Sequence, residues 1–152
     1  MMTYLWLAAF LASVVLLFIL VPEESIRRFN VFGLIAGFMV GLILLGLMTP
    51  VLGYWRFVPD FFTVAGMPLF LALAWWPVEI LFAHYFVQLS PTFNTLWLAL
   101  VPAGGAALFQ YLSLHLDLLD FRFWSLFATF LLSVGIHLGL GLYLRSLVGI
   151  RQ

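Results

Sequence analysis

Residues 31–52 read VFGLIAGFMVGLILLGLMTPVL and contain no charged side chain. A helix rises about 1.5 Å per residue, so this stretch would extend roughly 33 Å, and the hydrocarbon core of a bilayer is about 30 Å thick. Four further apolar stretches lie at residues 4–21, 68–87, 95–116 and 123–144. Backbone groups in lipid must be hydrogen-bonded within the segment. We therefore predict an all-α membrane protein, a bundle of five transmembrane helices forming one domain over residues 1–152.

The composition of the chain agrees with this class. Hydrophobic residues make up 66% of the 152 residues and charged residues only 8%, whereas about 25% of an ordinary soluble domain is charged. Six acidic residues balance six basic ones, so no basic surface exists to attract nucleic acid. The absence of cysteine excludes disulfides, zinc–thiolate sites and iron–sulfur clusters. We predict no cofactor, no metal site and no nucleic-acid partner.

The distribution of arginine predicts an orientation in the cell membrane. Five spans put the termini on opposite sides, with Arg27, Arg28, Arg145 and Arg151 on one side and Arg56 and Arg122 on the other. Cytoplasmic loops carry more basic residues, so the amino terminus is expected outside and the carboxyl terminus in the cytoplasm. Residues 53–67 (GYWRFVPDFFTVAGM) are expected to lie along the outer interface, and a further crossing hidden there would reverse this orientation.

Glycines recur at four-residue spacing in two spans. Gly33, Gly37 and Gly41 lie on one face of the second span, and Gly135 and Gly139 lie on one face of the fifth. Small residues at this spacing let another helix backbone approach closely. We predict that all five glycines serve helix packing within the chain, with a homo-oligomer interface as the alternative.

Glu79 is the most informative polar residue, because it lies well inside the third span. An acidic side chain at the centre of a spanning helix costs roughly 2.5 to 3.5 kcal/mol, so such groups usually pair or stay protonated. His137 is the expected partner because it lies at a compatible depth in the fifth span. We favour a buried pair that fixes the helix register. The alternative is an acid–base pair, with Glu79 and His137 catalytic, in an apolar pocket lined by Trp75, Trp76, Phe82 and Gln110.

Two resemblances bear on this choice. The segments YWRFVP at 54–59, GMPL at 66–69 and WPVEILF at 76–82 resemble a pattern in small membrane-embedded lycopene cyclases. The resemblance implies that Glu79 belongs to a carotenoid pocket, although Ile80 stands where that family has a second acid. The whole chain is also similar to short hydrophobic membrane proteins of Gram-positive bacteria, which share its early Pro-Glu-Glu and late Arg-Phe-Trp. That similarity implies location and fold but no activity.

Three function classes follow from these observations. We favour a non-catalytic integral membrane protein, a subunit or scaffold that packs through glycine-rich helices and has the lipid bilayer, a second copy or a larger membrane complex as partner. The alternative is a protein or enzyme that binds an isoprenoid or another apolar ligand and uses Glu79. A further alternative is a proton-coupled carrier or carrier subunit, because Pro77 interrupts the helix next to an acid.

Overall fold

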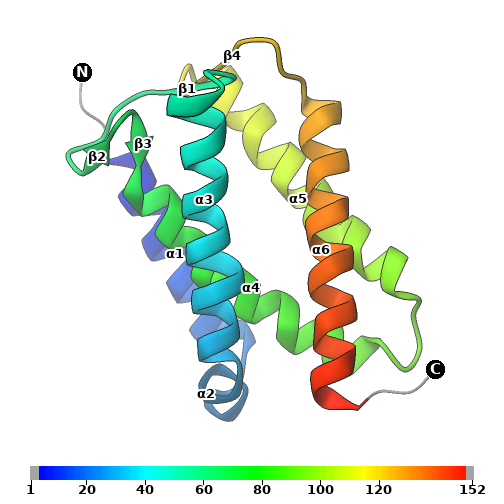
Figure 1. The fold of residues 1–152 in the computed structure, drawn as a ribbon. Coiled ribbons are helices and arrows are strands. Elements are labelled where there is room, and N and C mark those ends of the chain that lie inside the picture. Colours follow the sequence, from blue (N-terminus) through cyan, green and yellow to red (C-terminus); the bar gives the residue numbers. More distant parts are fainter. Residues whose placement is uncertain (1–3, 150–152) are drawn as a thin grey trace.

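The computed structural model describes residues 4–149 and is mostly helical (Figure 1). Its long elements are α1 (Leu5–Leu20), a continuous rod from Glu23 to Val51, α4 (Leu69–Leu89), α5 (Thr95–His115) and α6 (Leu126–Val148). Each of these five helical segments overlaps one of the five apolar stretches. Short strands and loops join them.

The rod combines α-helical and π-helical segments. It consists of α2 (Glu23–Phe32), η1 (Gly33–Met39), α3 (Val40–Gly46) and η2 (Leu47–Val51), where η marks the wider π-helix. It begins earlier than the apolar stretch at residue 31, because Glu23 and Glu24 occupy its first turn, where the helix dipole favours acidic side chains. A π-helical segment as long as η1 is unusual, and the four-residue glycine spacing did not predict it.

The boundaries of α6 follow from its caps. The Ser125 hydroxyl accepts a hydrogen bond from the Ala128 backbone N–H at 3.1 Å, so the helix starts after residue 125 rather than at 123. At the other end Gly149 has φ of +67°, the left-handed conformation that terminates many helices. The helix therefore extends four residues beyond the predicted end at residue 144.

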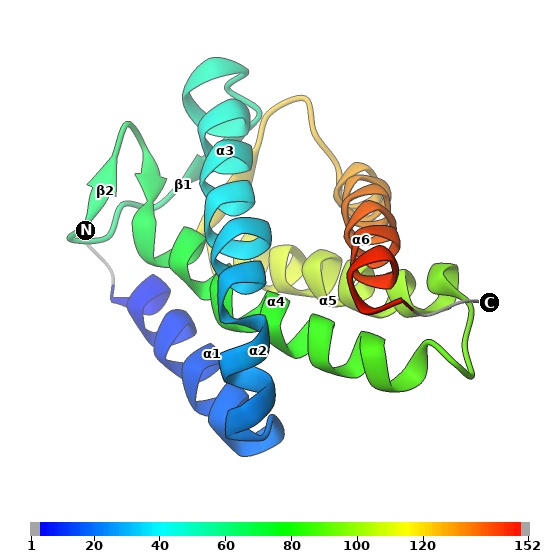
Figure 2. The ribbon, with the colours of Figure 1, turned by 60° about the horizontal axis from the view of Figure 1, so that its bottom comes forward.

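Helix α4 is the central element of the bundle. In its most apolar stretch 56% of the residues are buried, compared with 22% in both α5 and α6. Figure 2 shows α4 running through the middle of the molecule and crossing the rod, with α1 beside its first half and α6 toward its second half. Residues of α4 therefore contact the remaining helices in several directions at once.

Residues 53–67 form no helix, so this segment holds no hidden sixth helical crossing. It contains β1 (Trp55–Phe57) and β2 (Thr63–Val64), and β2 pairs with β3 (Met67–Pro68). Strand β1 pairs antiparallel with β4 (Leu119–Phe121). The sequence analysis did not predict these strands, which are too short to produce a recognisable alternation of apolar and polar residues.

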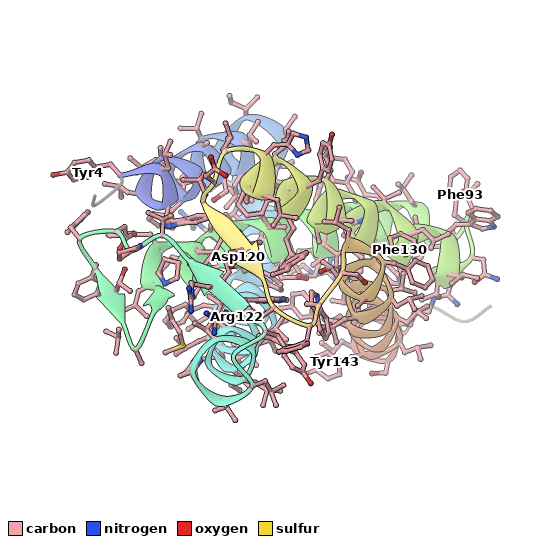
Figure 3. The ribbon with its side chains drawn as sticks, turned by 90° about the horizontal axis from the view of Figure 1, so that it is seen from above. Tyr4, Phe93, Asp120, Arg122, Phe130 and Tyr143 are labelled. Atoms are coloured by element: carbon pink, nitrogen blue, oxygen red, sulfur yellow. The ribbon has the colours of Figure 1, made fainter. Side chains whose placement is uncertain are left out.

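The strands define one end of the bundle, here named the strand end. Arg56 lies opposite Asp120 in the β1–β4 ladder. Figure 3 shows β4, with Asp120 labelled, crossing above the helices and leading to Arg122. Helix α1 begins at the strand end and α6 ends at the opposite end (Figure 1). Arg27, Arg28 and Arg145 lie on helices toward the opposite end, and Arg151 lies outside the described residues.

Two apolar clusters fill the interior. One is centred on aromatic and aliphatic residues of the strand end, including Trp6, Trp55 and Phe57. The other joins the start of the rod, the second half of α4 and the end of α6. The outward faces are also apolar, and many large hydrophobic side chains are exposed over all helices. Four helical segments, all except α1 with its 16 residues, are long and apolar enough to cross a membrane.

Candidate functional site

Glu79 and His137 meet in the interior of the helical bundle. The Nε2 atom of His137 lies 3.1 Å from Oε1 of Glu79. Glu79 is 1% exposed and His137 is 4% exposed. The two residues that the sequence analysis expected to meet are thus within hydrogen-bonding distance, one on the central helix α4 and the other on the inward face of α6.

The contacts of the other imidazole nitrogen indicate where the ring of His137 carries its hydrogen. The Nδ1 atom of His137 lies 2.7 Å from the backbone carbonyl oxygen of Ser133. A carbonyl oxygen only accepts hydrogen bonds, so Nδ1 carries a hydrogen. The Nε2 atom then either accepts a proton from a neutral Glu79 or donates one to its carboxylate. In both states a single proton is shared between Glu79 and His137.

The surroundings of this pair are apolar and closed. The ring of Phe82 meets the imidazole edge-on, with 5.0 Å between ring centres. The second carboxyl oxygen of Glu79, Oε2, is buried without a hydrogen-bond partner. A carboxyl oxygen without a partner in such surroundings is costly, so Glu79 depends on its contact with His137 for a hydrogen bond.

The predicted pocket of Trp75, Trp76, Phe82 and Gln110 does not form as one cavity. Trp75 packs against Gly41 of α3, whereas Trp76 lines a groove between α1, α2 and α4. Phe82 contacts His137. The prediction that these side chains converge is wrong, because Trp75 and Trp76 are consecutive residues that point about 100° apart toward different neighbouring helices.

Gln110 belongs to a separate polar cluster between α5 and α6. Its Oε1 accepts a short hydrogen bond from the hydroxyl of Thr129, and that hydroxyl oxygen accepts one from the Trp124 indole N–H at 2.8 Å. Thr129 lies two helical turns before His137 on the same inward face of α6. Gln110 therefore does not line a pocket around Glu79 and His137, where the sequence analysis had placed it.

The glycines of the rod pack closely against α4. A Cβ atom at Gly37 would lie 2.5 Å from the Trp75 carbonyl oxygen, and one at Gly33 would lie 2.8 Å from the Trp76 carbonyl oxygen. At Gly41 the nearest atom would be a ring carbon of Trp75 at 3.3 Å. The predicted close helix contact is present, and at Gly33 and Gly37 it is backbone against backbone.

The glycines predicted to pack in α6 do not do so within this chain. No atom would lie within 4 Å of a Cβ at Gly135 or Gly139. Both point away from the inward face that carries Ser133 and His137. The glycine that packs instead is Gly141, where a Cβ would lie 2.7 Å from the Phe86 ring. The sequence could have indicated this, because Gly141 lies four residues after His137 and so shares the inward face of α6.

Two open grooves flank the first part of the rod. The first, about 280 Å³ in volume, lies between the rod and α6, and Arg28, Phe32 and Tyr143 contribute to its lining. The second, about 430 Å³, lies between α1, α2 and α4 and includes Arg27 and Trp76. Neither groove is lined by Glu79 or His137. Each groove includes one arginine of a pair that the sequence analysis used only to predict the orientation.

No known protein family, curated protein or solved structure matches this chain. Within residues 4–149, no group of three or more histidine and acidic side chains gathers to hold a metal ion. The polar chemistry of the interior rests mainly on the Glu79–His137 pair and on the separate Gln110–Thr129 cluster.

Proposed function

We propose that the protein is a small polytopic integral membrane protein with a non-catalytic role, as a subunit or scaffold. The observation that carries this proposal is the enclosure of the Glu79–His137 pair. Its shared proton lies between two side chains that are almost completely buried, and neither groove includes them. A substrate atom must come within about 3 Å of an acid or base to exchange a proton with it. A closed pair of this kind suits a role in fixing α6 against α4.

The apolar outer surface supports membrane insertion, and five passes in one orientation are part of the proposal. Because the chain contains no cysteine, single introduced cysteines can report sidedness. We expect Asp120→Cys, at the strand end, to react with a membrane-impermeant maleimide on intact expressing cells. Glu24→Cys, at the opposite end, should react only after permeabilisation. Labelling of Glu24→Cys alone on intact cells would reverse the orientation, and labelling of both would contradict the three crossings proposed between these two positions.

The open face of α6 supports association through a glycine-rich surface. Gly135 and Gly139 are exposed and have no neighbour within 4 Å, so we propose that a second copy of the chain packs there. Gly139→Leu is expected to lower the association constant about tenfold, since overpacking at an interface costs about 1 to 3 kcal/mol. Energy transfer between labelled copies in lipid vesicles measures this, with Gly105→Leu on α5 as the control. Equal association constants for wild type and Gly139→Leu would contradict the proposal that a second copy packs on this face.

A lipid-pocket enzyme that uses Glu79 is the second candidate. One observation favours it, since Oε2 of Glu79 and Nε1 of Trp76 are both buried without hydrogen-bond partners, and unsatisfied buried groups call for a specific reason. The resemblance to lycopene cyclases implies such a reason, because it places Glu79 in a pocket for an apolar ligand. Ile80, in the place of that family's second acid, is instead fully buried and packs against Gly33.

A further inference from the structure

The groove between the rod and α6 combines a long apolar wall with a single cation. One wall comes from α2 and η1 and the other from the last turns of α6. Its apolar lining includes Phe32, Ile35, Ala36, Leu144, Leu147 and Val148. Arg28 is the only charged residue among the lining residues, and Tyr143 is the only other one with a polar side-chain group.

Arg28 stands at one end of this groove. The wall continues from Arg28 to Ala36 along the rod, a rise of about 12 Å. The rod and α6 run in opposite directions (Figure 1), so the end of α6 lies beside the start of the rod. Phe32 and Tyr143 stack across the space, with 6.4 Å between ring centres, and Figure 3 shows Tyr143 extending from α6 on the side of the rod. The groove thus has a charged end and an apolar length.

Arg28 and Arg27 differ in how far their charge is already neutralised. Arg27 forms an ion pair with Glu23 at 2.5 Å. Within the described residues Arg28 makes no ion pair, and its guanidinium carbon lies 5.2 Å from the centre of the Phe29 ring. A contact of this kind holds the cation without neutralising it. Arg28 therefore offers an uncompensated positive charge at the end of an apolar groove.

We propose that this groove binds one anionic phospholipid, with the phosphate group on Arg28 and an acyl chain along the wall formed by Phe32, Ile35 and Leu144. The match is one of charge and shape, because a phospholipid carries its negative charge at one end of a long apolar chain. Exposed wall residues such as Val31 and Ile35 leave the groove open on its outer side, so the lipid enters laterally from the bilayer. This inference rests on the proposed membrane location but is independent of the role of Glu79.

The test measures lipid binding to the full-length purified protein in detergent. Native mass spectrometry follows titration with phosphatidylglycerol or with phosphatidylcholine of the same acyl chains. We expect wild type to prefer phosphatidylglycerol about fivefold, the size of the contribution of one basic residue to an anionic lipid. Arg28→Gln should abolish that preference. Arg27→Gln, which makes the same charge change beside the other groove, should retain it.

A second pair of variants tests the apolar wall. Ile35→Trp places a larger side chain on the groove wall at a position that is 60% exposed, and should weaken binding of both lipids several-fold. Ile43→Trp, at a 66% exposed position of the same rod outside the groove, should not. Equal binding of the two lipids to wild type, equal loss in both arginine variants, or unchanged binding in Ile35→Trp would each overturn the proposal. Cysteine labelling tests the membrane location separately. If labelling gives the expected result but lipid binding fails, only the proposed lipid site is overturned and the membrane location stands.

Discussion

Gly37→Leu is expected to lower the free energy of unfolding by about 3 kcal/mol and to reduce the yield of folded protein. Overpacking of a tight site typically costs about 1 to 3 kcal/mol. At Gly37 the cost should reach the top of that range, because a Cβ would lie 2.5 Å from the carbonyl oxygen and 2.7 Å from the carbonyl carbon of Trp75. Those are backbone atoms of the central helix and cannot rotate away as a side chain can. Thermal unfolding in detergent, followed by circular dichroism, measures the loss.

The matched control for this variant is Gly105→Leu. Gly105 is also inside a helix, but no atom would lie within 4 Å of its Cβ, so only Gly37→Leu meets an obstacle. Gly53 also has open space, but its φ of +66° makes any side chain there strained, so it is not a clean comparison. Equal unfolding temperatures for Gly37→Leu and Gly105→Leu would mean that the rod does not pack on α4 through this glycine.

The two glycine series show how far spacing can predict packing. Both have the four-residue period that places glycines on one helix face, yet Gly37 is covered by α4 and Gly139 is open. Periodicity identifies residues that share a face. It does not tell whether another helix covers that face, because the cover depends on how each helix is rotated about its axis. In α6 the inward face is instead the one that carries Thr129, Ser133 and His137.

The unknown rotation of each helix about its axis also explains why the predicted Glu79–His137 contact is present while the predicted pocket is not. The approach of Glu79 to His137 could be anticipated because depth along two spans follows from residue counting, and because each polar group in an apolar interior needs a partner. The pocket required Trp75, Trp76, Phe82 and Gln110 to point to one place. Gln110 found its partner in Thr129, which the sequence analysis had not considered. The helical stretches themselves were predictable because each is a long apolar run with few charges, of the length expected for a helix that can span a bilayer.

His137→Leu is expected to be the other strongly destabilising substitution, by about 3 to 5 kcal/mol. Removing one member of a buried pair leaves the other without a partner in a medium that cannot solvate it. Glu79 would keep no hydrogen-bond partner at all, because its Oε2 has none already. Glu79→Gln should cost only about 1 kcal/mol, since an amide preserves the shape and can still donate a hydrogen bond to Nε2. Unfolding in detergent, monitored by circular dichroism, compares these variants.

The double variant Glu79→Leu with His137→Leu tests whether the two side chains stabilise the fold as a unit. Replacing both members of a buried pair by apolar residues is often neutral, so the double variant should be more stable than His137→Leu alone, with a coupling energy of about 2 kcal/mol. Additive losses would show that the two side chains do not act as a unit.

The same variants separate the two candidate functions, because Glu79→Gln retains the hydrogen bond but not the acid. If Glu79→Gln folds like wild type yet changes the isoprenoid products of cells that express it, the pair performs acid–base chemistry. If Glu79→Gln and the double variant both fold and associate like wild type without such a change, the shared proton serves only to hold α6 on α4.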